Sequence, residues 1–207
     1  LGSTLVKPID HLAIMSFTQE LASWMSPTKL DCGSLPKVGD SAPSTDLLKF
    51  PRADGKAAVV VFLRHCGCPF AEKSFILLRE AASKNPNVAF IAVSHSSESH
   101  TKKWLSEVGG PGDENPVEVI TNEERDVYAK WGLGTSSFMH VLSPNVLSNV
   151  FKLSREEGIA NRPTESGSRW QISGAWAVNE NGKVTWGGPA QTASEIPSVE
   201  EALSSLH

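Results

Sequence analysis

A cysteine stands where an apolar run changes into a helix-like pattern. Cys68 follows a run that ends in Phe62 and Leu63, and it directly precedes Pro69. Proline suits the first position of a helix because its fixed φ fits there and its missing N–H would have been unpaired anyway. A thiol at a helix N-terminus faces unpaired backbone N–H groups and the positive end of the helix dipole, and both favour the thiolate. The sequence therefore predicts a nucleophilic or redox-active sulfur at Cys68.

Two basic residues lie shortly before this cysteine. A fixed positive charge on Arg64, or a protonated imidazole on His65, would stabilise a thiolate at Cys68 and could bind an oxygen anion. His65 could also donate a hydrogen bond to the sulfur or act as a general acid toward a leaving oxygen. The alternative is that the alternation of side chains along a strand sends one of the two basic residues into a surface ion pair.

The other two cysteines permit more than one interpretation. Cys66 is two residues from Cys68, so a disulfide between them would close a small, strained ring that is easily reduced. Cys66 could resolve a sulfenic acid on Cys68, or it could be a small buried apolar residue. Cys32 could act as a resolving thiol only if the N-terminal segment folds back over the junction; otherwise it is an ordinary loop thiol. Three cysteines do not make the disulfide framework of a secreted protein, which favours redox or nucleophilic use.

Composition and charge limit the partners. The chain of 207 residues has a formal net charge of -4 and no long lysine or arginine cluster, which argues against nucleic acid or an anionic membrane as the main partner. No stretch approaches the roughly 18 apolar residues that a transmembrane helix needs, and no signal-peptide pattern opens the chain. We therefore expect a soluble, cytoplasmic protein, with residues 1–3 as the remnant of an expression tag.

The remaining pattern predicts an N-terminal helical extension over residues 1–35 and one α/β domain over residues 36–207. Apolar runs bounded by turn signals indicate strands, and apolar residues at helical spacing indicate helices. The helix after Cys68 should bury one face, formed by Ala71, Phe75, Leu78 and Ala82. The other expected elements are strands 57–63, 88–93 and 117–120, helices 98–108 and 123–131, a hairpin of strands 174–178 and 183–186, and a last helix 199–206.

A long connection covers residues 135–173. Connections of this length are usually functional or disordered. Arg169, near its end, could reach an anionic substrate as part of a lid or could simply be solvated. The connection should contain one helix that starts at Pro144, with a buried side formed by Leu147, Val150 and Phe151.

This order of elements, with a cysteine at the first strand-to-helix junction, resembles the thioredoxin fold. Residues 38–43, VGDSAP, look like the start of the AhpC/TSA peroxiredoxin superfamily, and residues 62–71, FLRHCGCPFA, are similar to its peroxiredoxin-like 2 branch. The motif of that branch runs roughly F-L-R-x-x-G-C-P-x-C. The resemblance implies a thioredoxin-like α/β fold with a central mixed sheet flanked by helices.

The sequence departs from these patterns at three places. Ordinary peroxiredoxins carry P-x-x-x-T-x-x-C, whereas Val61 and His65 occupy the proline and threonine positions here, so the usual hydroxyl partner of the peroxide is missing. Ala71 stands where the peroxiredoxin-like 2 motif has its second cysteine, which reduces the dithiol to one thiol. Ser173 stands where thioredoxins place a cis-proline, and this argues against thioredoxin-style docking of protein disulfides.

The resemblance implies an oxidoreductase that reduces a hydroperoxide, an endoperoxide or a related small electrophile through Cys68. Electrons would come from thioredoxin or a small thiol. His95 follows the second strand, whose end should lie near the junction, although a solvated loop position is the alternative. The catalytic candidates are Cys68, Arg64, His65 and Cys66, and the substrate-contacting candidates are Pro69, Phe70, His95, Arg169, Trp170 and Trp176.

Two other functions stay open. The scaffold could be reused to transform a hydrophobic metabolite by non-redox chemistry of the lyase or isomerase type, or it could be a non-catalytic binding module. We expect no cofactor. We also expect no metal, because His65, Cys66 and Cys68 are too crowded along the chain to surround a tetrahedral ion. A homodimer is left open.

Overall fold

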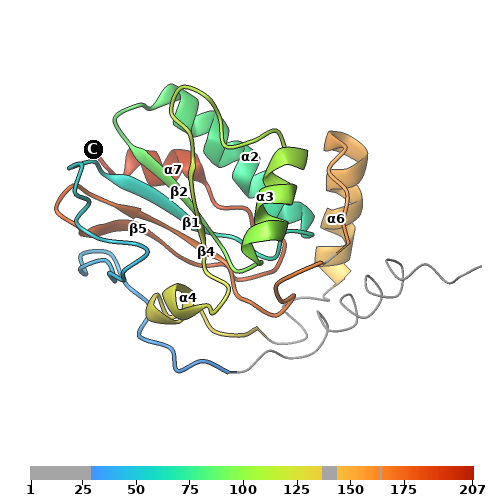
Figure 1. Cartoon of the computed structure of the whole chain (residues 1–207), viewed down its shortest axis with the longest axis horizontal. Helices are drawn as coiled ribbons and strands as arrows, with labels where there is room; N and C mark the ends of the chain where they lie inside the picture. The colour runs from blue at the N-terminus through green and yellow to red at the C-terminus, as the bar shows by residue number, and fades with distance from the viewer. Residues whose placement is uncertain (1–28, 137–143, 164) are drawn as a thin grey trace, which may run out of the picture.

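A five-stranded mixed sheet forms the centre of the molecule (Figure 1). The structure is a computed structural model, and it describes residues 29–136, 144–163 and 165–207. The strand order is β3-β2-β1-β4-β5, with β1 parallel to β2 and antiparallel to β4. The predicted thioredoxin-like α/β arrangement is confirmed. The strands are β1 (Ala58–Phe62), β2 (Ala89–Ser94), β3 (Glu118–Thr121), β4 (Gly174–Val178) and β5 (Val184–Pro189).

Strand β1 is buried on both of its faces, as its continuous apolar run predicts. Val59 and Val61 join the core on one side of the sheet, and Val60 and Phe62 join the core on the other side. Phe62 packs at ring-centroid distances of 5.2 Å, 5.2 Å and 5.6 Å against the rings of Tyr128, Trp131 and Trp176. The strand that leads to the cysteine is therefore held rigidly from above and below.

Helices cover the two faces unequally (Figure 1). The core on one face includes residues of α2 (Pro69–Lys84), α3 (Glu98–Glu107), α6 (Pro144–Glu157) and α7 (Val199–Ser204), whereas the short α4 (Asp126–Lys130) packs on the other face. Helix α2 starts where Pro69 predicts. Its four predicted apolar positions are all buried, which confirms the expected face: Ala71, Phe75, Leu78 and Ala82.

Helix α4 begins later than its sequence pattern suggests, at Asp126 and not at residue 123. Arg125 adopts the left-handed conformation, with φ 62°, so the backbone cannot continue a helix through it. The side-chain oxygen of Asn122 accepts the N–H of Val127 at 3.0 Å and supplies the N-terminal bond instead. A turn therefore replaces the first turn of the predicted helix.

Strand β5 continues to Pro189, three residues beyond its predicted end. Gly187 and Gly188 suggest a break in the sequence but pair with Trp176 and Ala175 of β4. A Cβ atom on Gly187 would lie 2.1 Å from the carbonyl oxygen of Ala175, and the residue has φ +122°. Glycine is thus required there for close approach of the two strands.

Helix α6 confirms the start at Pro144 but not the whole predicted buried side. Phe151 is 78% exposed, while Val146 and Leu153 are buried and Val150 is half-buried. The buried side of α6 is therefore formed by Val146, Val150 and Leu153, which are four and three positions apart, and it does not include Phe151. The side chain of Leu147 lies outside the described residues, as does most of the predicted N-terminal helical extension.

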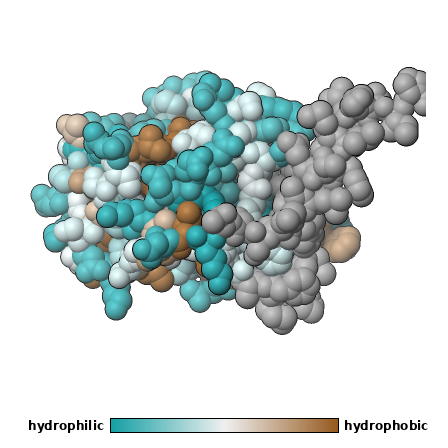
Figure 2. All heavy atoms as spheres, turned by 60° about the horizontal axis from the view of Figure 1, so that its bottom comes forward, coloured by the Kyte–Doolittle hydropathy of each residue, from teal (hydrophilic) through white to brown (hydrophobic). Residues whose placement is uncertain are grey.

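No helix in the described part of the chain is long and apolar enough to cross a membrane. Figure 2 shows the molecule from the side of α4, where the hydrophobic residues of the described chain appear as separate areas between hydrophilic ones. Four large apolar side chains are well exposed among residues 29–136, 144–163 and 165–207: Leu35, Val38, Leu47 and Phe151.

The position of Phe62 predicts a large stability effect. Phe62→Ala should lower the free energy of unfolding by about 3–5 kcal/mol, because it leaves a cavity among three aromatic rings. Phe151→Ala, the matched control on an exposed helix face, should change it by less than about 0.5 kcal/mol. Urea denaturation followed by circular dichroism measures both values, and equal losses would contradict the described core.

Candidate active site

Cys68 is the N-cap residue of α2, with φ -82° and ψ 125°. Its N–H donates to the carbonyl oxygen of His65 at 3.0 Å, and its own carbonyl oxygen accepts the N–H of Glu72 at 3.2 Å. Its side chain makes no capping hydrogen bond, and Pro69 has no N–H to offer. The predicted strand-to-helix junction is therefore present. The sulfur lies at the positive end of a 16-residue helix, with only 5% of the residue exposed.

Residues 63–68, between β1 and α2, form a loop that we call the cysteine loop. The end of the long connection covers this loop. Within residues 159–163 and 165–171, which we call the strap, the N–H of Arg162 donates to the carbonyl oxygen of Gly67 at 3.0 Å. A Cβ atom on Gly67 would lie 2.8 Å from the carbonyl oxygens of both Arg162 and Pro163. Only glycine permits this approach. The Arg162 guanidinium also binds the carboxylate of Glu72, with N–O distances of 3.0 Å and 3.2 Å.

His65 is fully buried beside this loop, and its Nδ1 accepts the N–H of Gly67 at 3.2 Å. Burial, followed by the positive charges of Arg64 and Arg169 and by the nearby His95, holds the pKa of His65 well below its usual value. The imidazole is therefore neutral near pH 7. It therefore cannot supply the positive charge toward Cys68 that the sequence allowed.

His95 is buried as well, so the alternative of a solvated loop histidine is wrong. Its Nε2 lies 3.1 Å from both the backbone nitrogen and the carbonyl oxygen of Ser168 in the strap. Burial is the main cause that lowers the pKa of His95 to about 4, with smaller contributions from Arg125 and Arg64. A neutral histidine thus fastens the strap to the end of β2.

Arg64 also turns inward, which overturns the alternative of a surface ion pair. The residue is 6% exposed, and its Nη2 donates to the carbonyl oxygen of Arg169 at 2.7 Å. Its buried Nε has no hydrogen-bond partner in the described structure. Arg169 is 8% exposed and not the solvated residue of the second interpretation. Arg64 therefore places a buried positive charge between the cysteine loop and the strap.

The other two cysteines occupy different surroundings. Cys66 is half-buried, and its Sγ lies 3.5 Å from Oγ of Ser94 and 3.8 Å from Oγ1 of Thr101. Cys32 lies beside Gly134, next to α4 and on the face of the sheet opposite α2. A resolving role for Cys32 requires a position over the junction, and the structure places it elsewhere.

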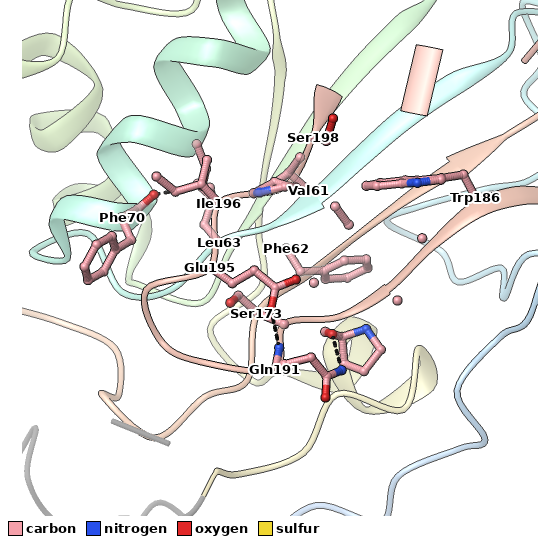
Figure 3. A pocket seen from close by; sticks show the side chains of 18 of the residues that line it. Val61, Phe62, Leu63, Phe70, Ser173, Trp186, Gln191, Glu195, Ile196 and Ser198 are labelled. Carbon is pink, nitrogen blue, oxygen red and sulfur yellow. Dashed lines mark hydrogen bonds between the residues drawn. The ribbon is translucent and has the colours of Figure 1, made fainter. Parts of the chain in front are cut away.

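A cavity of about 550 Å³ lies beside the first turn of α2 (Figure 3). Arg64, Phe70, Ala71 and Ser173 line it at the junction, but neither Cys66 nor Cys68 does. In Figure 3, Trp186 lies at one end of the cavity, and Phe70 lies at the other end. The segment after β5 supplies the remaining wall, with Gln191, Glu195 and Ile196 among its residues.

The two tryptophans that the sequence placed near the substrate do not line this cavity. Trp176 is fully buried in the opposite core, where its Nε1 donates to the carbonyl oxygen of Pro36 at 3.2 Å. Trp170 is half-buried, and its carbonyl oxygen accepts the N–H of Ser136 at 2.6 Å. Trp186 lines the cavity instead. Its place on β5, directly before a pair of glycines, gave no sequence signal for this role.

Sequence reasoning also missed the ion pair between Arg162 and Glu72. Arg162 was visible as a basic residue in a polar segment, but its partner lies 90 residues earlier and no local spacing connects them. Among the residues that the structure describes, no group of three histidine, cysteine, aspartate or glutamate side chains could hold a metal ion. The chemistry that this arrangement offers is that of thiols beside a buried guanidinium.

The two buried histidines predict a loss of stability in weak acid. Near pH 6.5 and below, these histidines bind protons in the unfolded chain. In the folded protein, His65 and His95 stay neutral until much lower pH. The free energy of unfolding should therefore fall as the pH drops from about 6.5 to about 4, by about 1.4 kcal/mol per pH unit for each histidine. His95→Gln should make this slope shallower. Urea denaturation at several pH values measures the slope, which must change in this variant for the assignment to hold.

Several solved structures of peroxiredoxin type are similar to this chain. A peroxiredoxin-like protein from Aquifex aeolicus is 16% identical with a TM-score of 0.53, and the alignment covers 84% of this chain and 88% of that one. A thiol peroxidase from Chromobacterium violaceum is 14% identical with a TM-score of 0.54, covering 87% and 98%. The peroxidoxin BcpB from Mycobacterium tuberculosis is 11% identical with a TM-score of 0.54, covering 83% and 96%. At these identities the likeness shows the fold.

The family assignment comes from the sequence. Among curated proteins, none matches the chain significantly. The sequence model of the family described as AhpC/TSA antioxidant enzyme matches residues 78–191, which is more than half of the chain. This match begins within α2, after Cys68, so it rests on the later elements of the fold and not on the cysteine loop. The chain belongs to the AhpC/TSA antioxidant enzyme family, a thiol-dependent redox family with a thioredoxin-like fold.

Proposed function

We propose that this protein is a thiol-dependent oxidoreductase that reduces a hydroperoxide, an endoperoxide or a related small electrophile through Cys68. The observation that carries the proposal is the place of Cys68 as the N-cap of α2, with a sulfur where a capping oxygen would otherwise sit. Oxygen-bearing residues are strongly preferred at such positions. A cysteine there gains reactivity from the helix N-terminus, and this supports a nucleophilic role.

The reaction that fits is a two-electron reduction. With a hydroperoxide, the thiolate of Cys68 attacks the terminal, hydrogen-bearing oxygen, an S–O bond forms, the O–O bond breaks, and the leaving alkoxide takes up a proton. The resulting sulfenic acid reacts with an external thiol to give a mixed disulfide and water. A second external thiol then attacks the mixed disulfide, forms a disulfide with the first external thiol, and restores the thiol of Cys68. Arg64, as a buried positive charge, would stabilise the developing oxygen anion.

Access to the sulfur is restricted, which bears on the substrate and the reductant. The strap lies directly on the cysteine loop through the bond between Arg162 and Gly67. Cys68 is 5% exposed and does not line the larger cavity, so a substrate can reach its sulfur only after the strap or another neighbouring segment shifts. A small thiol fits this enclosed setting better than the surface of thioredoxin, although both remain within the proposal.

One observation favours a second function. The cavity of about 550 Å³ has walls of Val61, Phe70 and Ile196 together with polar groups, yet no sulfur lines it. Apolar pockets with a few polar groups are typical of small-molecule sites. The scaffold could therefore bind or transform a hydrophobic metabolite without using Cys68, as a tailoring enzyme or a binding module. Catalysis or ligand binding that survives Cys68→Ser would support this second function over the first.

Removal of the Cys68 thiol should abolish peroxide consumption. Cys68→Ser keeps the size and the capping position but loses the nucleophile, so turnover of an organic hydroperoxide in the presence of a small thiol should fall at least a hundredfold. Cys32→Ser, on the other face of the sheet, is the matched control and should consume peroxide like the unaltered protein. Full activity of Cys68→Ser would refute the proposal. Mass spectrometry after limiting peroxide would show which cysteine is oxidised.

Ala71 permits a test of the redox scaffold itself. The residue is 2% exposed and lies three positions after Cys68, where side chains share a helix face. Ala71→Cys should create a dithiol that forms an internal disulfide after oxidation, whereas Ala71→Ser, the matched control, should stop at a sulfenic acid or a mixed disulfide. Counts of free thiols before and after peroxide distinguish the two. An Ala71→Cys protein whose two thiols stay reduced would favour the second function.

A further inference from the structure

A second, smaller cavity of about 240 Å³ lies on the other side of the cysteine loop. It is bounded by Cys66, by α3 and by the strap, and it shares no lining residue with the larger cavity. Cys66 is half-buried and lines this cavity, whereas Cys68 is buried and lines neither. The thiol that meets solvent at a defined pocket is therefore Cys66.

The sulfur of Cys66 has hydroxyl groups placed to support an anion. Oγ of Ser94 accepts the N–H of Ser96 at 3.3 Å and lies 3.5 Å from Sγ of Cys66. Oγ1 of Thr101 can donate to the carbonyl oxygen of Ser96 at 3.3 Å. The remaining hydroxyl proton of Ser94 can then point to Thr101 or to the sulfur. Rotation of the Ser94 hydroxyl about its C–O bond can therefore aim a donor at the sulfur of Cys66.

One residue of the same cavity wall carries an unpartnered donor. Trp104 is 3% exposed, and its ring packs edge-on against Phe75 with centroids 5.2 Å apart. Its buried Nε1 has no hydrogen-bond partner within the described structure, and Trp104 is part of the cavity wall. A buried indole N–H normally finds an acceptor. A ligand with a carbonyl or carboxylate oxygen that reached this nitrogen past the cavity wall would supply it.

The rim of the cavity carries both signs of charge. Nζ of Lys103 binds both carboxylate oxygens of Glu165 at 2.8 Å, and Nη1 of Arg162 lies 3.2 Å from the carboxylate of Glu107. All four side chains line the cavity. Alternating charges of this kind match a ligand that bears ammonium and carboxylate groups together, and they match a purely apolar ligand poorly.

We propose that this cavity binds a small thiol of the amino-acid or short-peptide type and that Cys66 forms a mixed disulfide with it. With a symmetric disulfide as the oxidant, the thiolate of Cys66 attacks one sulfur. The new S–S bond forms as the old one breaks, and the departing thiolate takes up the proton that Cys66 lost. The exchange makes no use of Cys68, so this proposal stands independently of peroxide reduction.

The test compares two disulfides on the folded, full-length protein. Glutathione disulfide carries ammonium, carboxylate and amide groups, and bis(2-hydroxyethyl) disulfide carries none of them. Modification is followed by intact-protein mass spectrometry, and each rate is divided by the rate for a short peptide with the sequence around Cys66. We expect glutathione disulfide to be favoured on the protein relative to the peptide. Cys66→Ser should abolish the modification, and Cys68→Ser should leave it unchanged.

Two further variants separate recognition from mere exposure. Trp104→Phe keeps an aromatic ring against Phe75 but removes the N–H, and it should slow the reaction with glutathione disulfide about fivefold to tenfold without changing the reaction with the neutral disulfide. Lys103→Gln alters an exposed side chain at the rim and should act in the same direction, which keeps the test valid if Trp104→Phe fails to fold. Modification at Cys68 or Cys32, or equal normalised rates for both disulfides, would overturn the proposal.

Discussion

The close approach of the strap to Gly67 is the constraint on which the site depends. Because residue 67 has no side chain, the carbonyl groups of Arg162 and Pro163 can lie against the cysteine loop. The same strap then accepts a hydrogen bond from Arg64 and meets His95 through Ser168. This one contact covers Cys68, lets the side chains of Arg64 and His95 bind the strap, and separates two cavities, one on each side of the loop. A larger residue at position 67 would displace all of these together.

The buried basic groups beside the loop differ in charge, and the difference follows from their surroundings. His65 and His95 are neutral because burial penalises the imidazolium and neighbouring positive charges oppose it. Arg64 keeps its charge, since a guanidinium is not deprotonated in proteins. Electrostatic interactions are strengthened where water is excluded. Stabilisation of an anion at this place therefore falls to Arg64, while the histidines act through hydrogen bonds that hold the strap.

Local features of the sequence predicted the junction but not the directions of its side chains. The apolar run of β1 and the proline after Cys68 act within a few residues, so the strand, the start of α2 and its buried face follow from them. The inward turn of Arg64 depends on a carbonyl group 105 residues later. The misplaced buried side of α6 has a similar cause, because the face of a helix is chosen by the neighbours it meets and the spacing around Phe151 allows more than one.

The two edges of the sheet have a consequence for how copies of this chain can meet. Edge strands expose unpaired backbone groups that invite a strand from another molecule. On one edge, β3 is four residues long and carries Glu118, whose carboxylate pairs with Arg52 at 3.1 Å. On the other, β5 ends in Pro189, which lacks a donor, two residues after Gly187, whose φ is 122°. Both edges therefore carry features that disfavour the addition of a strand from another molecule to a continuous intermolecular sheet.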